Sequence, residues 1–203
     1  MSESDAAGTS PAAGPAGATG GPVIRGLVVA DWEAIISLEA EAYAPLGLSE
    51  TPAVLRAKAA ASPGTCFVVL AGAETVGGYL LALPSPPHRP PSWGRTEAAT
   101  ALRDNLHIHD LVVSPPLRGQ GLGRRLVAHV EDTARALGCA SVSLVAVGGA
   151  DRFWATLGYT ARPHVTVTDY GASAVYMSRS LGARDPSPAH AVSPAPQSPH
   201  RRS

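Results

Sequence analysis

Lysine and long apolar runs are both scarce in this chain of 203 residues, and each scarcity argues against a class of protein. Lys58 is the only lysine among 16 basic residues, and these are balanced by 16 acidic residues. A neutral chain lacks the basic surface that is typical of nucleic-acid-binding proteins. No stretch reaches the roughly 18 apolar residues of a membrane helix. We therefore expect no nucleic acid and no membrane among the partners.

Cysteine is also rare, since it occurs only as Cys66 and Cys139. Their spacing fits no metal-binding pattern, so we expect buried thiols in a reducing cytoplasm and no bound metal. The first residues have neither the basic region nor the apolar region of a secretory signal. A cytoplasmic location is therefore the expectation.

The composition divides the chain into one domain with a tail on each side. Residues 1–22 consist mainly of small residues and proline, and residues 182–203 are rich in Pro, Ser, His and Arg. Neither segment has the periodic apolar residues needed to form a core, so both are expected to be disordered. The remaining residues, 23–181, are enough for one domain with a core of its own.

Within this domain, hydrophobic periodicity predicts alternating strands and helices. A long loop over 84–106 contains five prolines and is too long for a simple connection, so it is expected to line a functional site or to be mobile. We predict strands at 23–29, 65–72, 75–83, 107–113, 141–147, 159–168 and 173–181, and helices at 31–43, 50–61, 120–137 and 150–157, with Asp31 as the N-cap of the first helix.

The most informative segment is HIHDLVVSPPLRGQGLGR, residues 107–124. Its first seven residues alternate as in a strand, and Ser114-Pro115-Pro116 ends that strand because proline has no N–H for the ladder. A glycine-rich turn and an amphipathic helix follow. Glycines let backbone N–H groups approach an anion closely, and a helix N-terminus favours negative charge. This order therefore predicts a phosphate-binding site.

The glycines have three other possible interpretations. A dinucleotide-binding loop needs GxGxxG, whereas Gly119, Gly121 and Gly123 are spaced GxGxG. A P-loop needs Gly-Lys-Ser/Thr, but Arg124 follows the last glycine. A tight turn without any ligand remains a third alternative.

The spacing Arg118-x-x-Gly121-x-Gly123 after a strand resembles motif A of the GNAT N-acetyltransferase superfamily. The resemblance continues at Phe153-Trp154 and at Gly158-Tyr159, and it covers roughly residues 23–181. It implies an α/β (α+β) fold of the GNAT type, with a mixed sheet of about seven strands and about four helices splayed around acetyl-CoA. The residues it assigns to acetyl-CoA are Leu111, Val112, Val113, Arg118, Gly119, Gln120, Gly121, Leu122, Gly123 and Arg124.

Two histidines precede the glycine loop, and they are the candidate catalytic residues. His107 and His109 are two positions apart, so we expect both side chains on one face of the strand, together with Leu111 and Val113. Histidine can accept the proton that an amine must lose before it attacks a thioester. The pattern resembles the arylalkylamine N-acetyltransferases, in which two strand histidines are thought to relay that proton. The alternative is that one or both are core histidines bonded to backbone carbonyls.

The chain departs from those enzymes at the aromatic pair. Where they have a tyrosine that can protonate the leaving thiolate, this chain has Trp154, whose indole N–H is not a usable acid. Tyr43 and Tyr170 are candidates for a replacement phenol, although both could be purely structural. We therefore predict an enzyme, an acetyl-CoA-dependent N-acetyltransferase acting on a small primary amine, as a monomer or homodimer. The alternatives are a protein or peptide N-acetyltransferase and a catalytically weak acyl-CoA-binding sensor.

Overall fold

The structure of the chain is a computed structural model that describes residues 21–72, 74–94 and 104–182. The expected tails at 1–22 and 182–203 lie outside the described residues, except for residues 21, 22 and 182. Residues 95–103 of the expected loop also lie outside them. In the part of the chain that is described, no helix is long and apolar enough to cross a membrane.

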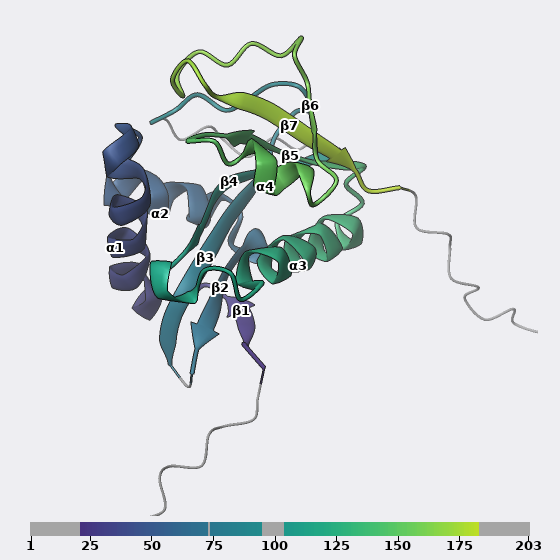
Figure 1. Cartoon of the computed structure of the whole chain (residues 1–203). Helices are drawn as coiled ribbons and strands as arrows, with labels where there is room; N and C mark the ends of the chain where they lie inside the picture. Colours follow the sequence, from purple (N-terminus) through teal and green to yellow (C-terminus); the bar gives the residue numbers. More distant parts are fainter. Residues whose placement is uncertain (1–20, 73, 95–103, 183–203) are drawn as a thin grey trace, which may run out of the picture.

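A seven-stranded mixed sheet forms the centre of the molecule, in the order β1-β2-β3-β4-β5-β7-β6 (Figure 1). Only β4 and β5 are parallel to each other, and every other neighbouring pair is antiparallel. The predicted fold class is thereby confirmed. The strands are β1 (Ile24–Gly26), β2 (Cys66–Ala71), β3 (Thr75–Pro84), β4 (Asn105–Val113), β5 (Ser141–Ala146), β6 (Thr160–Ala161) and β7 (Val175–Ser180).

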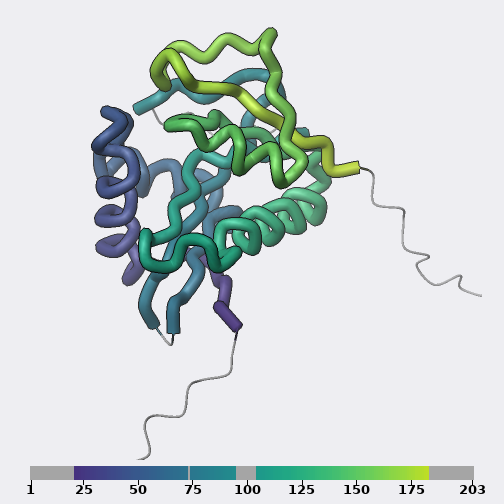
Figure 2. Tube along the Cα trace, viewed as in Figure 1, coloured from purple at the N-terminus to yellow at the C-terminus, as the bar shows by residue number. Residues whose placement is uncertain are grey.

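Helices cover both faces of this sheet and enclose two separate apolar clusters. The helices α1 (Trp32–Tyr43) and α2 (Pro52–Ala61) pack on one face, where Ile35, Leu55 and Tyr79 are fully buried. The opposite face carries α3 (Leu122–Ala136) and the short α4 (Asp151–Ala155). Figures 1 and 2 show α1 and α2 on one side of the sheet and α3 on the other. On α3 the buried apolar residues recur at the helical spacing that is typical of an amphipathic helix, at Leu122, Leu126, Val127, Val130 and Ala134.

The two parallel strands separate part of the way along, and this separation opens the sheet. β4 and β5 are paired from Asn105↔Ser141 to Ile108↔Leu144, and β4 then continues to Val113 without β5 beside it. Backbone groups of both strands beyond that point are therefore available to a ligand. This is the splayed centre that the fold prediction implied.

A bulge in β4 reverses which face its side chains occupy. Opposite Leu81 and Ala82 of β3 lie Asp110 and Ile108, so His109 has no partner on β3. Before the bulge, Ile108 packs on the α3 face; after it, Leu111 packs there too. The predicted common face of the histidines with Leu111 and Val113 was therefore wrong, because the extra residue interrupts the two-residue alternation.

Two further predictions about local structure need correction. The strand expected at 159–168 is only β6, because Pro163, which has no N–H for the ladder, follows the last rung that Arg162 makes to Tyr176. Asp31 does precede α1, but its carboxylate accepts no bond from that helix. It accepts instead the backbone N–H of Val28 and two bonds from Arg25, both 2.7 Å long.

Candidate active site

The separation of β4 and β5 opens into a cavity of about 740 Å³. That volume is within the range of small-molecule and cofactor sites. Its walls are the part of β4 that has no β5 partner, the turn before α3, the end of β5, the end of α1 and α4. It is lined by nine of the ten residues predicted to hold acetyl-CoA: Leu111, Val112, Val113, Arg118, Gly119, Gly121, Leu122, Gly123 and Arg124. The tenth, Gln120, is not among the lining residues, and its amide donates to the Pro116 carbonyl.

The glycine turn has the geometry of an anion cradle. Gly119 and Gly121 have φ of 78° and 79°, a left-handed conformation that side chains disfavour. A Cβ built on either would meet no protein atom within 4 Å, so the space in front of both is open. Gly121 is also the N-cap of α3, whose first N–H groups have no partner within the helix. The turn and helix can therefore hold a phosphate with backbone donors.

Gly123 has a different role, because it lies inside the first turn of α3. A Cβ there would lie 3.4 Å from Cζ of Phe153, at van der Waals distance. Gly123 therefore lies where α3 packs against α4. Phe153 and Trp154 pack edge to face, with ring centroids 5.2 Å apart, and both line the large cavity.

His109 lies where the large cavity meets a smaller one. The smaller cavity, about 30 Å³, is also lined by Tyr43, Trp93, Asp110 and Tyr170. Tyr43, His109, Val145 and Val147 line both cavities. The small cavity has room for a group of roughly two heavy atoms. Such a group would lie beside His109, next to the large cavity.

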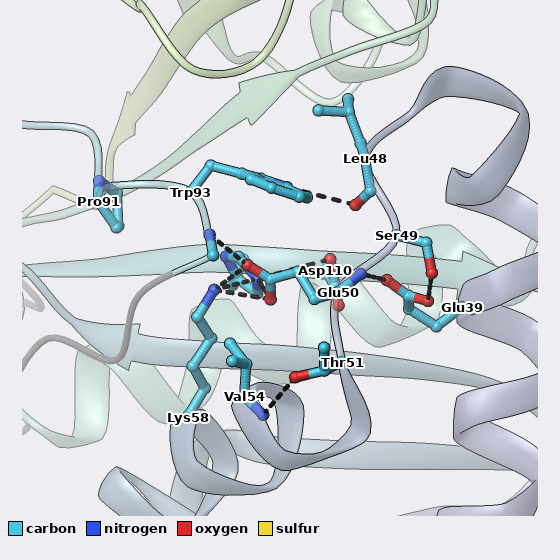
Figure 3. Close-up of polar contacts among 12 residues, drawn as sticks. Glu39, Leu48, Ser49, Glu50, Thr51, Val54, Lys58, Pro91, Trp93 and Asp110 are labelled. Atoms are coloured by element: carbon cyan, nitrogen blue, oxygen red, sulfur yellow. Dashed lines mark hydrogen bonds and ion pairs between the residues drawn. The ribbon is translucent and has the colours of Figure 1, made fainter.

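The ring of His109 belongs to a buried cluster with Glu50 and Lys58. Nε2 of His109 lies 2.9 Å from Oε2 of Glu50 and 2.8 Å from Nζ of Lys58. Lys58 in turn donates to Oε1 and Oε2 of Glu50 at 2.6 and 2.8 Å. Figure 3 shows the Lys58 side chain rising from α2 to meet Glu50. Nδ1 of His109 is buried and has no partner among the described residues.

Glu50 is the centre of this cluster and is held as a carboxylate. Burial opposes its ionisation, but the hydrogen bonds and charges of His109 and Lys58 outweigh that effect and lower its pKa to about 2. The backbone N–H of Gly94 donates to Oε1 at 2.8 Å. The backbone N–H of Glu50 donates to one carboxylate oxygen of Glu39, and the other oxygen of Glu39 accepts a hydrogen bond from the hydroxyl of Ser49 (Figure 3). Glu50 is therefore anchored through both its side chain and its backbone.

His107 occupies a different environment from His109. It is 1% exposed, and it lines neither cavity. Nδ1 lies 3.0 Å from Oγ of Ser143 on β5, and the ring stacks on Tyr176 at 6.2 Å between centroids. Burial, with smaller contributions from His109 and Lys58, lowers the pKa of His107 to about 3. The structure therefore brings only one of the two predicted bases to the cavities.

Both candidate phenols lie on the small cavity. Burial raises the pKa of Tyr43 well above its usual value, so its hydroxyl stays protonated at neutral pH. The hydroxyl of Tyr170 donates to the carbonyl of Pro91 at 2.9 Å, which ties the loop before β7 to the loop after β3. Nε1 of Trp93 donates to the carbonyl of Leu48 at 3.3 Å. The small cavity is therefore enclosed by three chain segments that are far apart in sequence, and Figure 2 shows the loops after β3 and before β7 side by side.

Sequence reasoning missed Glu50, Lys58 and Trp93. One signal for Lys58 was available: it is the only lysine, and it falls on the face of α2 that also buries Leu55 and Ala59. A cation at a core position needs a buried anion beside it. No comparable signal marked Glu50 or Trp93. Among the described residues, no group of three or more His, Cys, Asp or Glu side chains could hold a metal ion.

Comparison with known families gives one match of sequence and many of structure. The profile of the acetyltransferase (GNAT) family matches residues 32–159. This range contains the glycine turn, both histidines and the aromatic pair, and it spans more than half of the chain. No curated protein matches the chain by sequence.

Solved structures share the fold at low sequence identity. The loading GNATL domain of CurA from Lyngbya majuscula is 15% identical with a TM-score of 0.67, over 81% of this chain and all of that one. Ard1 from Thermoplasma volcanium is 19% identical with a TM-score of 0.60, over 78% of this chain and 97% of that one. N-acetylglutamate synthase from Neisseria gonorrhoeae, complexed with coenzyme A and N-acetyl-glutamate, is 18% identical with a TM-score of 0.62, over 81% of this chain and 36% of that one.

Proposed function

The chain belongs to the acetyltransferase (GNAT) family, and from that premise we propose that it transfers an acetyl group from acetyl-CoA to a small primary amine, with His109 as the general base. The observation that carries this proposal is the position of His109. It is the one ionisable side chain with an unpartnered buried nitrogen among the described residues, and it stands where the two cavities meet.

The large cavity suits the acyl donor. The open space in front of Gly119 and Gly121 and the N-terminus of α3 would take the pyrophosphate. The backbone of β4 beyond Ile108, which has no β5 partner, would bond the amide groups of the pantetheine arm. This arrangement would bring the thioester to the place where the strands separate, next to His109. Gln120 is not required by it, because its side chain lies outside the lining.

The acceptor would enter through the small cavity, and its small volume favours an amine head group. An amine of pKa near 10.4 is almost entirely ammonium at pH 7 and cannot attack until it loses a proton. Nδ1 of His109 would take that proton as the nitrogen bonds to the thioester carbonyl carbon. The C–S bond then breaks, the sulfur leaves with the electron pair as the CoA thiolate, and the second proton of the attacking nitrogen passes to that thiolate, which gives the neutral amide and CoA thiol. Tyr43 lines both cavities, and its hydroxyl, which also interacts with Asp110, would donate a hydrogen bond to that thiolate.

The bonds from Trp93 to Leu48 and from Tyr170 to Pro91 favour a small acceptor over a peptide, because they tie segments together across the acceptor side. We place the reaction in the reducing cytoplasm, where the buried thiols of Cys66 and Cys139 would remain reduced. Burial also raises the pKa of the Cys66 thiol to about 11, so it is not a reactive nucleophile.

A direct test is acetyl-CoA turnover, followed by the release of free thiol, with a panel of small primary amines and a panel of short peptides. We expect amine-dependent thiol release from the wild-type protein and a loss of about 10²–10⁴ in rate for His109→Gln, the usual value of a general base. Faster turnover of peptides than of any amine would replace the small-molecule proposal with peptide acetylation. Binding of acetyl-CoA without turnover of either panel would support an acyl-CoA-binding sensor instead.

A further inference from the structure

The cluster of Lys58, Glu50 and His109 constrains where the imidazole carries its proton. Nε2 of His109 lies within 2.9 Å of both a carboxylate oxygen of Glu50 and the ammonium nitrogen of Lys58. A carboxylate only accepts hydrogen bonds and an ammonium only donates them. Nε2 can therefore satisfy one of these neighbours but not both. Each choice fixes what remains at Nδ1, the atom that has no partner among the described residues.

If Nε2 carries the hydrogen, it donates to Glu50 and leaves a lone pair at Nδ1. If Nδ1 carries the hydrogen, Nε2 accepts from Lys58, its lone pair lies 2.9 Å from a carboxylate oxygen, and a buried N–H is left unpaired. Buried N–H groups without a partner are rarer in proteins than under-used acceptors. Lys58 also has both oxygens of Glu50 as acceptors, at 2.6 and 2.8 Å, and does not depend on the imidazole. The first arrangement is therefore favoured.

We propose that Glu50 and Lys58 are positioning residues for His109: Glu50 accepts the Nε2–H and so keeps a basic lone pair on Nδ1, while Lys58 offsets the charge of Glu50. This inference rests on the proposed function, in which His109 is the base. When the amine's proton moves to Nδ1, the Nε2–H stays on Glu50, so the imidazolium remains hydrogen-bonded at that side. Without Lys58, the negative charge of Glu50 beside the imidazole would be unbalanced.

Other charged and titratable groups surround the imidazole and are common to every variant below. Oδ1 of Asp110 lies 3.9 Å from Nε2. Tyr43 from α1 and Tyr170 from the loop before β7 line the small cavity with His109. His107 precedes it on β4 and stays uncharged at neutral pH, since burial lowers its pKa to about 3. A change confined to Glu50 or Lys58 therefore reports on this cluster.

The first test measures kcat/KM against pH for Lys58→Met, Glu50→Gln and the double variant. Removing the cation favours imidazolium, so for Lys58→Met we expect the acidic limb to move to higher pH by on the order of one unit. For Glu50→Gln, which removes the anion, we expect the acidic limb to move to lower pH. The double variant keeps the net charge of the cluster, so its acidic limb should lie close to the wild-type position. KM for acetyl-CoA should stay unchanged. An acidic limb that stays in place in both single variants overturns the proposal.

The second test is made on the wild-type protein, and a variant is used only to assign the His109 signal. ¹⁵N NMR of the histidine-labelled wild-type protein distinguishes a protonated ring nitrogen from one with a lone pair. For His109, assigned by its absence in His109→Gln, we expect hydrogen on Nε2 and a lone pair on Nδ1. Hydrogen on Nδ1 overturns the proposal. Full activity of His109→Gln would instead contradict the proposed function, whatever the tautomer, so the two failures are distinguishable.

Discussion

Nδ1 of His107 lies 3.0 Å from Oγ of Ser143, on the strand next to its own. The corresponding atom of His109, two residues later, has no partner among the described residues. One ring is thus held within the sheet, and the other faces the cavities. We therefore expect the two histidines to contribute differently to catalysis, although the sequence pattern alone does not distinguish them.

Single substitutions of the two histidines should therefore have different effects on kcat. His109→Gln removes the base beside the acceptor, so we expect kcat to fall by about 10²–10⁴, with less effect as the pH approaches the pKa of the amine. His107→Gln should reduce kcat less than tenfold, because that side chain lines neither cavity. Steady-state kinetics between pH 6 and 9 on a substrate with rate-limiting chemistry would measure both. Equal losses in the two variants would favour a relay through both rings.

His107 should instead affect the stability of the protein in acid. Its pKa in the folded protein is about 3, against 6.5 for a free histidine, so between these values the unfolded chain binds the proton that the folded chain excludes. The free energy of unfolding should then fall as the pH falls from about 6.5 towards 3, by up to roughly 1.4 kcal/mol per pH unit from this residue. Denaturant melts of wild type and His107→Gln would show a shallower dependence in the variant. Parallel dependences would mean that the ring is solvated in solution.

The order of the elements could be predicted from the sequence because it depends on local periodicity. The alternation in β4, the glycine turn and the helical spacing of Leu122, Leu126 and Val130 each lie within one segment. What could not be predicted depends on pairing between segments. The bulge at His109 exists only in the register of β4 against β3, and it changes the face of every later residue of the strand.

The candidate site divides in the same way. The predicted residues of the cavity wall all lie within one segment, 111–124, so motif resemblance could assign them. The contacts of His109 come from Glu50 and Lys58, which are 59 and 51 positions away. Only the tertiary structure brings these side chains together, because neither the loop before α2 nor the buried face of α2 has a pattern that specifies a partner on β4.

The glycine turn can be tested with a substitution that has a matched control on the same helix. Gly121 and Gly138 flank α3 with φ of 79° and 81°, and a Cβ at either would meet no protein atom within 4 Å. Alanine at either position should therefore cost a similar amount of stability, about 1–2 kcal/mol. Only Gly121→Ala should weaken acetyl-CoA binding in calorimetry, because its Cβ enters the predicted pyrophosphate site. Equal affinities in the two variants would contradict the assignment of the turn.

The predicted domain boundaries at 23 and 181 can be tested by truncation. Residues 1–20 and 184–203 contain few large apolar side chains, so they can bury little surface against the domain. Deleting both should leave the melting temperature and the affinity for acetyl-CoA unchanged. A fall of several degrees in differential scanning calorimetry would show that one of these segments packs on the domain.

The enclosure of the small cavity should determine the size of the acceptor. Tyr170→Phe keeps the ring but removes the hydroxyl that donates to Pro91, a bond worth about 1 kcal/mol. We expect KM for a small amine to rise several-fold with KM for acetyl-CoA unchanged, because only the acceptor side is loosened. Tyr159→Phe is the matched control: its hydroxyl donates to Glu131 at 3.1 Å, within the core cluster on the α3 face. That variant should lose stability without a change in amine KM. If both variants behave alike, the loop before β7 does not shape the acceptor site.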